Sequence, residues 1–180
     1  MRILGFAAST SSTSINKKLV EYTVPLFPAG EVEVIDLNDY KVPPFSVDQE
    51  KQGFPEGAKL FLEKIKQSDA IICSMSEHNR NWTACFKNLF DWCSRIELKL
   101  FQERPMFLMS TSPGGYGGQN SLNLAKTVFP SFGGQVKDSF ALPKYYENFD
   151  EVNGIINGEL AAELKEKIEK YRSELNEVAV

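Results

Sequence analysis

The chain opens with Met1-Arg-Ile-Leu-Gly-Phe-Ala-Ala8, and this apolar run is followed at once by Ser9-Thr-Ser-Ser-Thr-Ser-Ile-Asn16. A short apolar run that ends at a turn signal is typical of a buried strand. After the hydroxyl-rich stretch, apolar residues recur at helical spacing, at Ile15, Leu19, Tyr22 and Leu26. The chain therefore begins with a predicted strand, a loop and a helix that starts near Ser14.

A loop between the carboxyl end of a strand and the amino end of a helix is a candidate phosphate-binding site. Unpaired backbone N–H groups and the positive end of the helix dipole attract an anion there. An ordinary N-cap is the alternative, and it needs only one or two Ser, Thr or Asn residues. Seven of the eight positions 9–16 are of these types, which favours phosphate binding. The predicted phosphate ligands are Ser9, Ser11, Ser14, Ile15 and Asn16.

Strand and helix patterns alternate along the rest of the chain. Further strands are expected at residues 32–36, 69–74, 105–110 and 135–142. Helices are expected at residues 58–67, 83–96, 117–132 and 159–177. Three of the strands are almost wholly apolar, which indicates a parallel sheet with helices on both faces. No repeat or linker divides the pattern, so residues 1–180 are interpreted as a single α/β domain.

Sheets of this kind bind ligands beyond the carboxyl ends of their strands. Neither GxGxxG nor GxxxxGK[ST] follows the first strand, and no hydrolase motif or metal-ligand spacing is present. The later loops carry glycines that let the backbone approach a flat ligand, and Trp82 and Tyr116 offer aromatic surface. A phosphate loop with two ring-lining loops favours flavin mononucleotide (FMN). The alternatives are a glycine-rich turn that merely enters a helix and a Trp82 that only packs. The predicted ring-binding residues are Ser76, Glu77, His78, Asn79, Trp82, Ser112, Pro113, Gly114, Gly115, Tyr116 and Gly117.

Composition limits the partners and the compartment. The chain has 180 residues, 42% of them hydrophobic, and a net charge of −4, which argues against nucleic acid or an anionic membrane as a partner. No apolar segment is long enough for a membrane span or a signal peptide. The three cysteines lack metal spacing and are interpreted as reduced thiols of a cytoplasmic protein. No metal site is expected, and the single histidine, His78, has no obvious nucleophile beside it.

The sequence resembles the NADPH-dependent FMN reductase family over nearly its whole length. That family opens with G-S-x-R-x-x-S-x-N, which Ser9, Ser14 and Asn16 match. Its second motif, P-E-Y-N-G-S-x-P-G-x-L-K-N-x-x-D-W-x-S-R, aligns without a gap with residues 76–95. The third loop, residues 110–118, is also similar. Two departures from the family motifs change the charge. Ser11 stands where the family has arginine, and Arg80 stands where the second motif has glycine.

The resemblance implies a flavodoxin-like three-layer sandwich whose five parallel strands follow the order 2-1-3-4-5. It also implies bound FMN and NADPH or NADH as co-substrate. Hydride would pass from the nicotinamide to FMN N5 and then to a quinone or similar small acceptor, in ping-pong order. FMN would carry the chemistry, so no catalytic side chain is predicted. A non-catalytic FMN electron carrier, or a degenerate member that binds another phosphate ligand, remains an alternative. With Ser11 in the first loop, Lys17 or Lys18 is expected to help neutralise the phosphate.

A homodimer or homotetramer is expected, with the helix 83–96 near the subunit contact, as the resemblance implies. Trp82 and Trp92 lie off the apolar stripe of this helix, and large aromatic residues beside such a stripe favour a contact surface. The alternative is that Trp92 packs within its own subunit.

Overall fold

A computed structural model describes residues 1–178 of the chain, with side chains through Glu177. Its main sheet has five strands in the order β2-β1-β3-β6-β7, and all neighbouring pairs are parallel. This is the expected order 2-1-3-4-5, so the predicted fold is confirmed. The strands are β1 (Ile3–Ala7), β2 (Val32–Ile35), β3 (Ala70–Ser74), β6 (Arg104–Thr111) and β7 (Gly134–Leu142).

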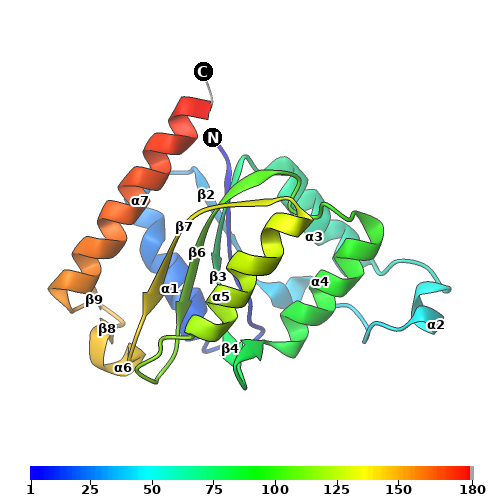
Figure 1. Cartoon of the computed structure of the whole chain (residues 1–180), viewed down its shortest axis with the longest axis horizontal. Helices are drawn as coiled ribbons and strands as arrows, with labels where there is room; N and C mark the ends of the chain where they lie inside the picture. Colours follow the sequence, from blue (N-terminus) through cyan, green and yellow to red (C-terminus); the bar gives the residue numbers. More distant parts are fainter. Residues whose placement is uncertain (179–180) are drawn as a thin grey trace.

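Helices cover both faces of the sheet and make three layers (Figure 1). Two helices pack on one face, α1 (Ile15–Thr23) and α7 (Gly158–Val178). The other face is covered by α3 (Glu56–Gln67), α4 (Ala84–Ile96) and α5 (Gln119–Val128). None of these described helices combines the length and the hydrophobicity that crossing a bilayer requires.

The inner strands are apolar throughout because both of their faces are buried. Side chains alternate between the two faces of a strand, so each strand supplies both cores. In β3, for example, Ile71 and Cys73 join the core under α3, α4 and α5, whereas Ala70 and Ile72 join the core under α1 and α7. This two-sided burial explains the apolar runs that predict the strands.

Several short elements have no strong sequence signal. Two-residue strands form two antiparallel hairpins, one from β4 (Glu77–His78) and β5 (Asn81–Trp82), the other from β8 (Phe149–Asp150) and β9 (Gly154–Ile155). Two single-turn helices are α2 (Val47–Glu50) and α6 (Tyr145–Asn148). A two-residue strand is too short to show an alternating pattern, and a single turn is too short to show a helical one.

One buried side chain joins the ends of three strands. Asn16 lies in the first turn of α1, directly after β1, and is buried. Its Oδ1 accepts hydrogen bonds from the Ser74 hydroxyl at 2.7 Å and from the Thr111 N–H at 3.1 Å. Its Nδ2 donates to the Thr111 carbonyl at 3.1 Å. The amide therefore fixes the start of α1 against the carboxyl ends of β3 and β6.

We expect Asn16→Ala to lower the free energy of unfolding by about 2–4 kcal/mol, because it leaves the Ser74 hydroxyl and both Thr111 backbone groups unpaired in the interior. Urea unfolding measures this difference. The control is Ser12→Ala in the same loop, an exposed change that should cost no more than about 0.5 kcal/mol. Equal effects of the two changes would show that the amide does not brace the strands.

Candidate functional site

Three loops leave the carboxyl edge of the sheet side by side. They follow β1, β3 and β6, which are neighbours in the sheet, and they lead into α1, the β4–β5 hairpin and α5. Figure 1 shows this edge at the bottom, near the labels α6 and β4. In a doubly wound sheet this edge is where ligands bind. The structure thus brings together the three loops on which the predicted residues lie.

The first loop is braced by its own hydroxyl groups. Ser9 Oγ accepts from the Ser11 N–H at 3.2 Å, and Ser11 Oγ accepts from the Thr13 N–H at 3.3 Å. Ser14 is the N-cap of α1, and its Oγ accepts from the Lys17 N–H at 3.2 Å. These contacts show that Ser9, Ser11 and Ser14 shape the loop, whatever else they bind.

Backbone donors at the start of α1 remain unpaired. Among the described residues, none accepts a hydrogen bond from the N–H groups of Thr10, Ser12, Ile15 or Asn16. The first N–H groups of a helix point along its axis and carry the positive end of its dipole. The Asn16 side chain is committed to the strand ends, so Asn16 can offer an anion only its backbone. An anion at this loop would satisfy these donors.

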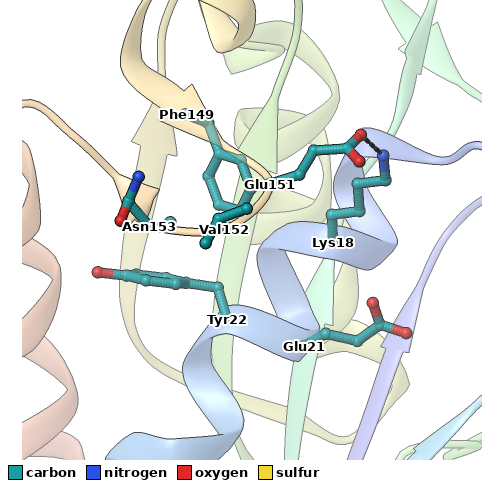
Figure 2. A pocket seen from close by; sticks show the side chains of 8 residues that line it. Lys18, Glu21, Tyr22, Phe149, Glu151, Val152 and Asn153 are labelled. Atoms are coloured by element: carbon teal, nitrogen blue, oxygen red, sulfur yellow. Dashed lines mark hydrogen bonds and ion pairs between the residues drawn. The ribbon is translucent and has the colours of Figure 1, made fainter.

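The two lysines of α1, Lys17 and Lys18, are both paired with carboxylates. Lys17 Nζ lies 2.7 Å from Asp36 Oδ2, and this hydrogen bond lowers the pKa of Asp36 and raises that of Lys17. Lys18 pairs with Glu151 on the β8–β9 hairpin, as the dashed line in Figure 2 shows. The expectation that a lysine neutralises the phosphate is therefore not supported by the arrangement of these side chains.

The pocket in Figure 2 lies on the flank of α1, beside the β8–β9 hairpin. It measures about 340 Å³ and is formed by α1 and the β8–β9 hairpin. Tyr22 and Phe149 pack edge to face there, with ring centroids 5.7 Å apart. Apart from Lys18, none of the residues predicted to bind phosphate or ring lines this pocket. The Tyr22–Phe149 and Lys18–Glu151 contacts hold the hairpin on α1.

The second loop is a tight hairpin whose tip is exposed. Its two central residues, Asn79 and Arg80, have φ angles of 52° and 64°. Two consecutive left-handed residues are typical of the type I′ turn that closes a two-residue hairpin. His78, Asn79 and Arg80 are exposed, which places their side chains beyond the sheet edge.

Glu77 connects the second loop to the helix that follows the third. Its Oε1 accepts from Asn120 Nδ2 and its Oε2 from the Ser121 N–H, both at 3.0 Å. Asn120 and Ser121 lie in the first turn of α5, whose own N-cap, Gly118, has no side chain to offer. The carboxylate therefore caps α5 from another loop, and it is a contact that its sequence position does not reveal.

The expectation that Trp82 offers aromatic surface to a ligand is wrong. This side chain is only 5% exposed and packs against Phe86, Phe90 and Phe129. Its Nε1 donates to the Ser121 carbonyl at 3.1 Å. Trp82 thus belongs to the core beneath the loops and cannot present its ring to a ligand.

Trp92 is likewise not part of a contact surface. It is fully buried, its Nε1 donates to the Pro43 carbonyl at 2.7 Å, and its ring packs edge to face on Phe45. Pro43 and Phe45, in the segment that precedes α2, thus cover Trp92. The expectation that Trp92 marks a subunit contact is therefore wrong, because Trp92 packs within its own subunit.

The third loop is held by β7 and by the turn after it. The Lys144 N–H donates to the Gly114 carbonyl at 2.9 Å, and the Tyr145 N–H donates to the Ser112 carbonyl at 3.0 Å. Gly117 has a φ of 62°, and a Cβ there would lie 3.0 Å from the Leu142 carbonyl oxygen. Gly117 is thus required for packing on β7. Pro113, Gly114, Gly115 and Tyr116 are exposed and form the outer part of the loop.

A hollow of about 440 Å³ lies between the second and third loops. We call it the hairpin pocket; it is lined by Glu77, Arg80, Tyr116 and Asn120. Near the end of β3, Ser76 is buried, and its Oγ has no hydrogen-bond partner among the described residues. An unpaired buried hydroxyl at a strand end calls for a polar partner. Together with the unpaired donors of α1, it fits a ligand that has a phosphate and a polar ring.

The family of the chain follows from comparison with known proteins. The model of the NADPH-dependent FMN reductase family matches residues 1–147, so the chain belongs to this family. An NAD(P)H-dependent FMN reductase of Pseudomonas aeruginosa is 29% identical over 118 residues, which cover 65% of this chain and 63% of that protein. A quinone reductase of Pseudomonas putida is 32% identical over 112 residues, which cover 61% of this chain and 59% of that protein. The matches thus span less than two thirds of each of these two relatives.

The solved structures include a flavoenzyme with the same fold. FerB, an NAD(P)H:(acceptor) oxidoreductase of Paracoccus denitrificans, superimposes with a TM-score of 0.76 over 98% of this chain and 97% of that one. At 21% identity, this likeness shows the flavodoxin-like fold alone. The description of the family names NADPH and FMN.

We expect Glu77→Ala to lower the free energy of unfolding by about 1–2 kcal/mol, because α5 loses a charged cap. Hydrogen exchange in the first turn of α5 should rise at the same time. The control is Glu147→Ala, which removes an exposed ion pair with Lys144 and should cost about 0.5 kcal/mol or less. Unchanged exchange in α5 would contradict the capping role of Glu77.

Proposed function

We propose that the chain is a single FMN-binding domain that oxidises NAD(P)H and reduces a quinone or similar small acceptor. The observation that carries this proposal is the set of unpaired donors at the strand ends: the N–H groups of Thr10, Ser12, Ile15 and Asn16, and the Ser76 hydroxyl. The family match and the names of the curated relatives support the same activity.

The phosphate would lie at the amino end of α1. Ser9, Ser11 and Ser14 line the loop, and Ile15 and Asn16 contribute backbone N–H groups of the first helical turn. Because both α1 lysines are in ion pairs, the helix dipole and these hydrogen bonds would carry the attraction. None of these proposed phosphate ligands carries a charged side chain.

The ring would lie against the backbones of the second and third loops. Ser76, Glu77, His78 and Asn79 would face its polar edge from one side, and residues 112–116 from the other. A Cβ on Gly115 would meet no atom within 4 Å, so the outer loop has free space beside it. Trp82 would support the loop from below without touching the ring.

FMN, when bound, would supply the redox chemistry, which is hydride acceptance from the nicotinamide and two-electron reduction of the acceptor. The overall reaction would convert NAD(P)H, a quinone and a proton to NAD(P)⁺ and a hydroquinone. The hairpin pocket, at about 440 Å³, offers one space for both reactants. We therefore propose ping-pong order, in which NAD(P)⁺ leaves before the acceptor enters. No side chain of the protein needs to act as an acid or base in this reaction.

The colour of the purified protein tests this function. We expect a yellow protein with FMN bound in a one-to-one ratio, and NADPH or NADH should bleach it in the absence of oxygen. Added quinone should then restore the colour. A yellow protein that neither nucleotide bleaches would be an electron carrier, and a protein that stays colourless with added FMN would overturn the cofactor assignment.

Ser14→Asp tests where the phosphate lies. Aspartate caps helices as well as serine does, so α1 should stay intact while a negative charge faces the phosphate. At an effective dielectric of about 20, such repulsion costs several kcal/mol, and we expect FMN affinity to fall at least about 10-fold to 100-fold. The matched control, Ser14→Asn, caps without charge and should bind nearly as well. Equal FMN dissociation constants for the two variants would place the phosphate elsewhere.

We also propose a homodimer or homotetramer that works in the cytoplasm, with α4 near the subunit contact. Four large apolar side chains are exposed on the side of the molecule that carries α2, α3 and α4 (Figure 1); they are Val47, Phe54, Leu60 and Leu98. All three cysteines are free, and burial raises the pKa of the Cys93 thiol to about 12, so it stays protonated.

Light scattering at micromolar concentration measures the assembly. We expect a mass at least twice that of the 20.3 kDa chain. Replacing Leu60 and Leu98 together with lysine should weaken the assembly, because a charge at an apolar contact must lose its water. A monomeric mass with full flavin and full activity would contradict the proposal.

A further inference from the structure

Arg80 occupies a backbone conformation that disfavours an arginine. It is the second residue of the β4–β5 turn, with a φ of 64°. A type I′ turn strongly prefers glycine at this position, and a residue with a Cβ is strained there. The family motif has glycine at the matching place. A strained residue at the edge of a binding site is a signal of function.

The Arg80 guanidinium is a cation without a partner. No described residue forms an ion pair or a hydrogen bond with it, and the side chain is exposed. The other cations around the three loops are paired: Lys17 with Asp36, Lys18 with Glu151, and Lys144 with Glu147 at 3.0 Å. Arg80 is therefore the one available positive group around these loops in the described part of the chain.

The position of Arg80 directs this charge at the hairpin pocket, which it lines together with Tyr116. Glu77 lines the same pocket, but both of its oxygens accept hydrogen bonds from the start of α5. The carboxylate is thus engaged elsewhere and leaves the guanidinium free. A planar guanidinium binds phosphate, sulfonate and carboxylate groups through two parallel hydrogen bonds.

We propose that Arg80 is a specificity-determining residue that binds an anionic group on the ligand entering the hairpin pocket. The proposal rests on the proposed function, which supplies two sources of such a group. One is the 2′-phosphate that distinguishes NADPH from NADH, and the other is an acidic substituent on the acceptor. In both cases Arg80 acts on the choice of ligand and leaves the redox step to the cofactor.

The first test measures equilibrium binding to the flavin-loaded protein, without turnover. We expect wild type to bind NADP⁺ about tenfold more tightly than NAD⁺, and Arg80→Gly to abolish the difference. Arg80→Lys should keep part of it, because a lysine retains the charge without the paired hydrogen bonds. Raising the salt concentration should weaken the preference in wild type.

The second test separates the two sources of the anion by steady-state kinetics. If the 2′-phosphate is bound, Arg80→Gly raises KM for NADPH about tenfold and leaves KM for NADH unchanged. If an acidic acceptor is bound, the variant raises KM for a sulfonated quinone and leaves KM for a neutral quinone unchanged. Either pattern supports the proposal, and the second pattern supports it even where NADP⁺ and NAD⁺ bind alike.

Relief of strain supplies a readout that does not depend on ligands. Arg80→Gly should raise Tm by about 2–4 °C, since glycine adopts the left-handed conformation freely. The matched control is Gln102→Gly, at a φ of 50° in the turn before β6, at the opposite edge of the sheet. It should raise Tm similarly and change no ligand preference.

The outcomes distinguish this proposal from the proposed function. If Arg80→Gly is stabilised but keeps every nucleotide and quinone preference of wild type, Arg80 binds no anion and the inference is overturned. If wild type fails to oxidise either nucleotide, the proposed function fails. A preference for NADP⁺ over NAD⁺ that is lost in Arg80→Gly would still uphold the role of Arg80.

Discussion

The three loops of the site depend on the buried amide of Asn16. It comes from the first turn of α1, yet its hydrogen bonds end on Ser74 and Thr111, at the carboxyl ends of β3 and β6. Parallel strands share no local connection at this edge, so something must hold their ends in register. An amide is suited to this because it accepts and donates at once. The second and third loops begin within a few residues of an atom that this side chain binds, and the first loop ends at the helical turn that contains Asn16.

Three further polar side chains connect the loops to the helices around them. The Thr83 hydroxyl donates to the Ala8 carbonyl at 2.8 Å, which fixes the start of α4 to the end of β1. Glu77 caps α5 from the neighbouring loop, and the Trp82 indole donates to the same helical turn at Ser121. Loops fixed at several points hold a ligand with little loss of conformational freedom on binding. The edge of the sheet is in this way ordered before any ligand arrives.

The strands and long helices could be predicted because each buries enough apolar surface to leave a periodic pattern. The hydroxyl-rich loop and the glycine-rich loop could also be located, since both follow apolar runs. The orientation of individual side chains could not be predicted. Trp82, for example, bonds to a residue 39 positions away, and Asn16 to one 95 positions away. Such contacts arise from the crossing of elements distant in sequence, and no local spacing encodes them.

The same limit applies to charge. The lysines after the first loop look available in the sequence, but Asp36 at the end of β2 and Glu151 in the β8–β9 hairpin occupy them. The positive charges beside the first loop are therefore paired, whereas the one at the hairpin tip is not. A phosphate at α1 would then be held by backbone donors, whose geometry is fixed by the helix, with no cation close enough to attract a second anionic group. Around these three loops, within the described part of the chain, a second ligand with its own anionic group would find an unpaired cation at Arg80, beside the hairpin pocket. Under the proposed function, the separation of these two positions would allow one cofactor to stay bound while successive reactants enter and leave.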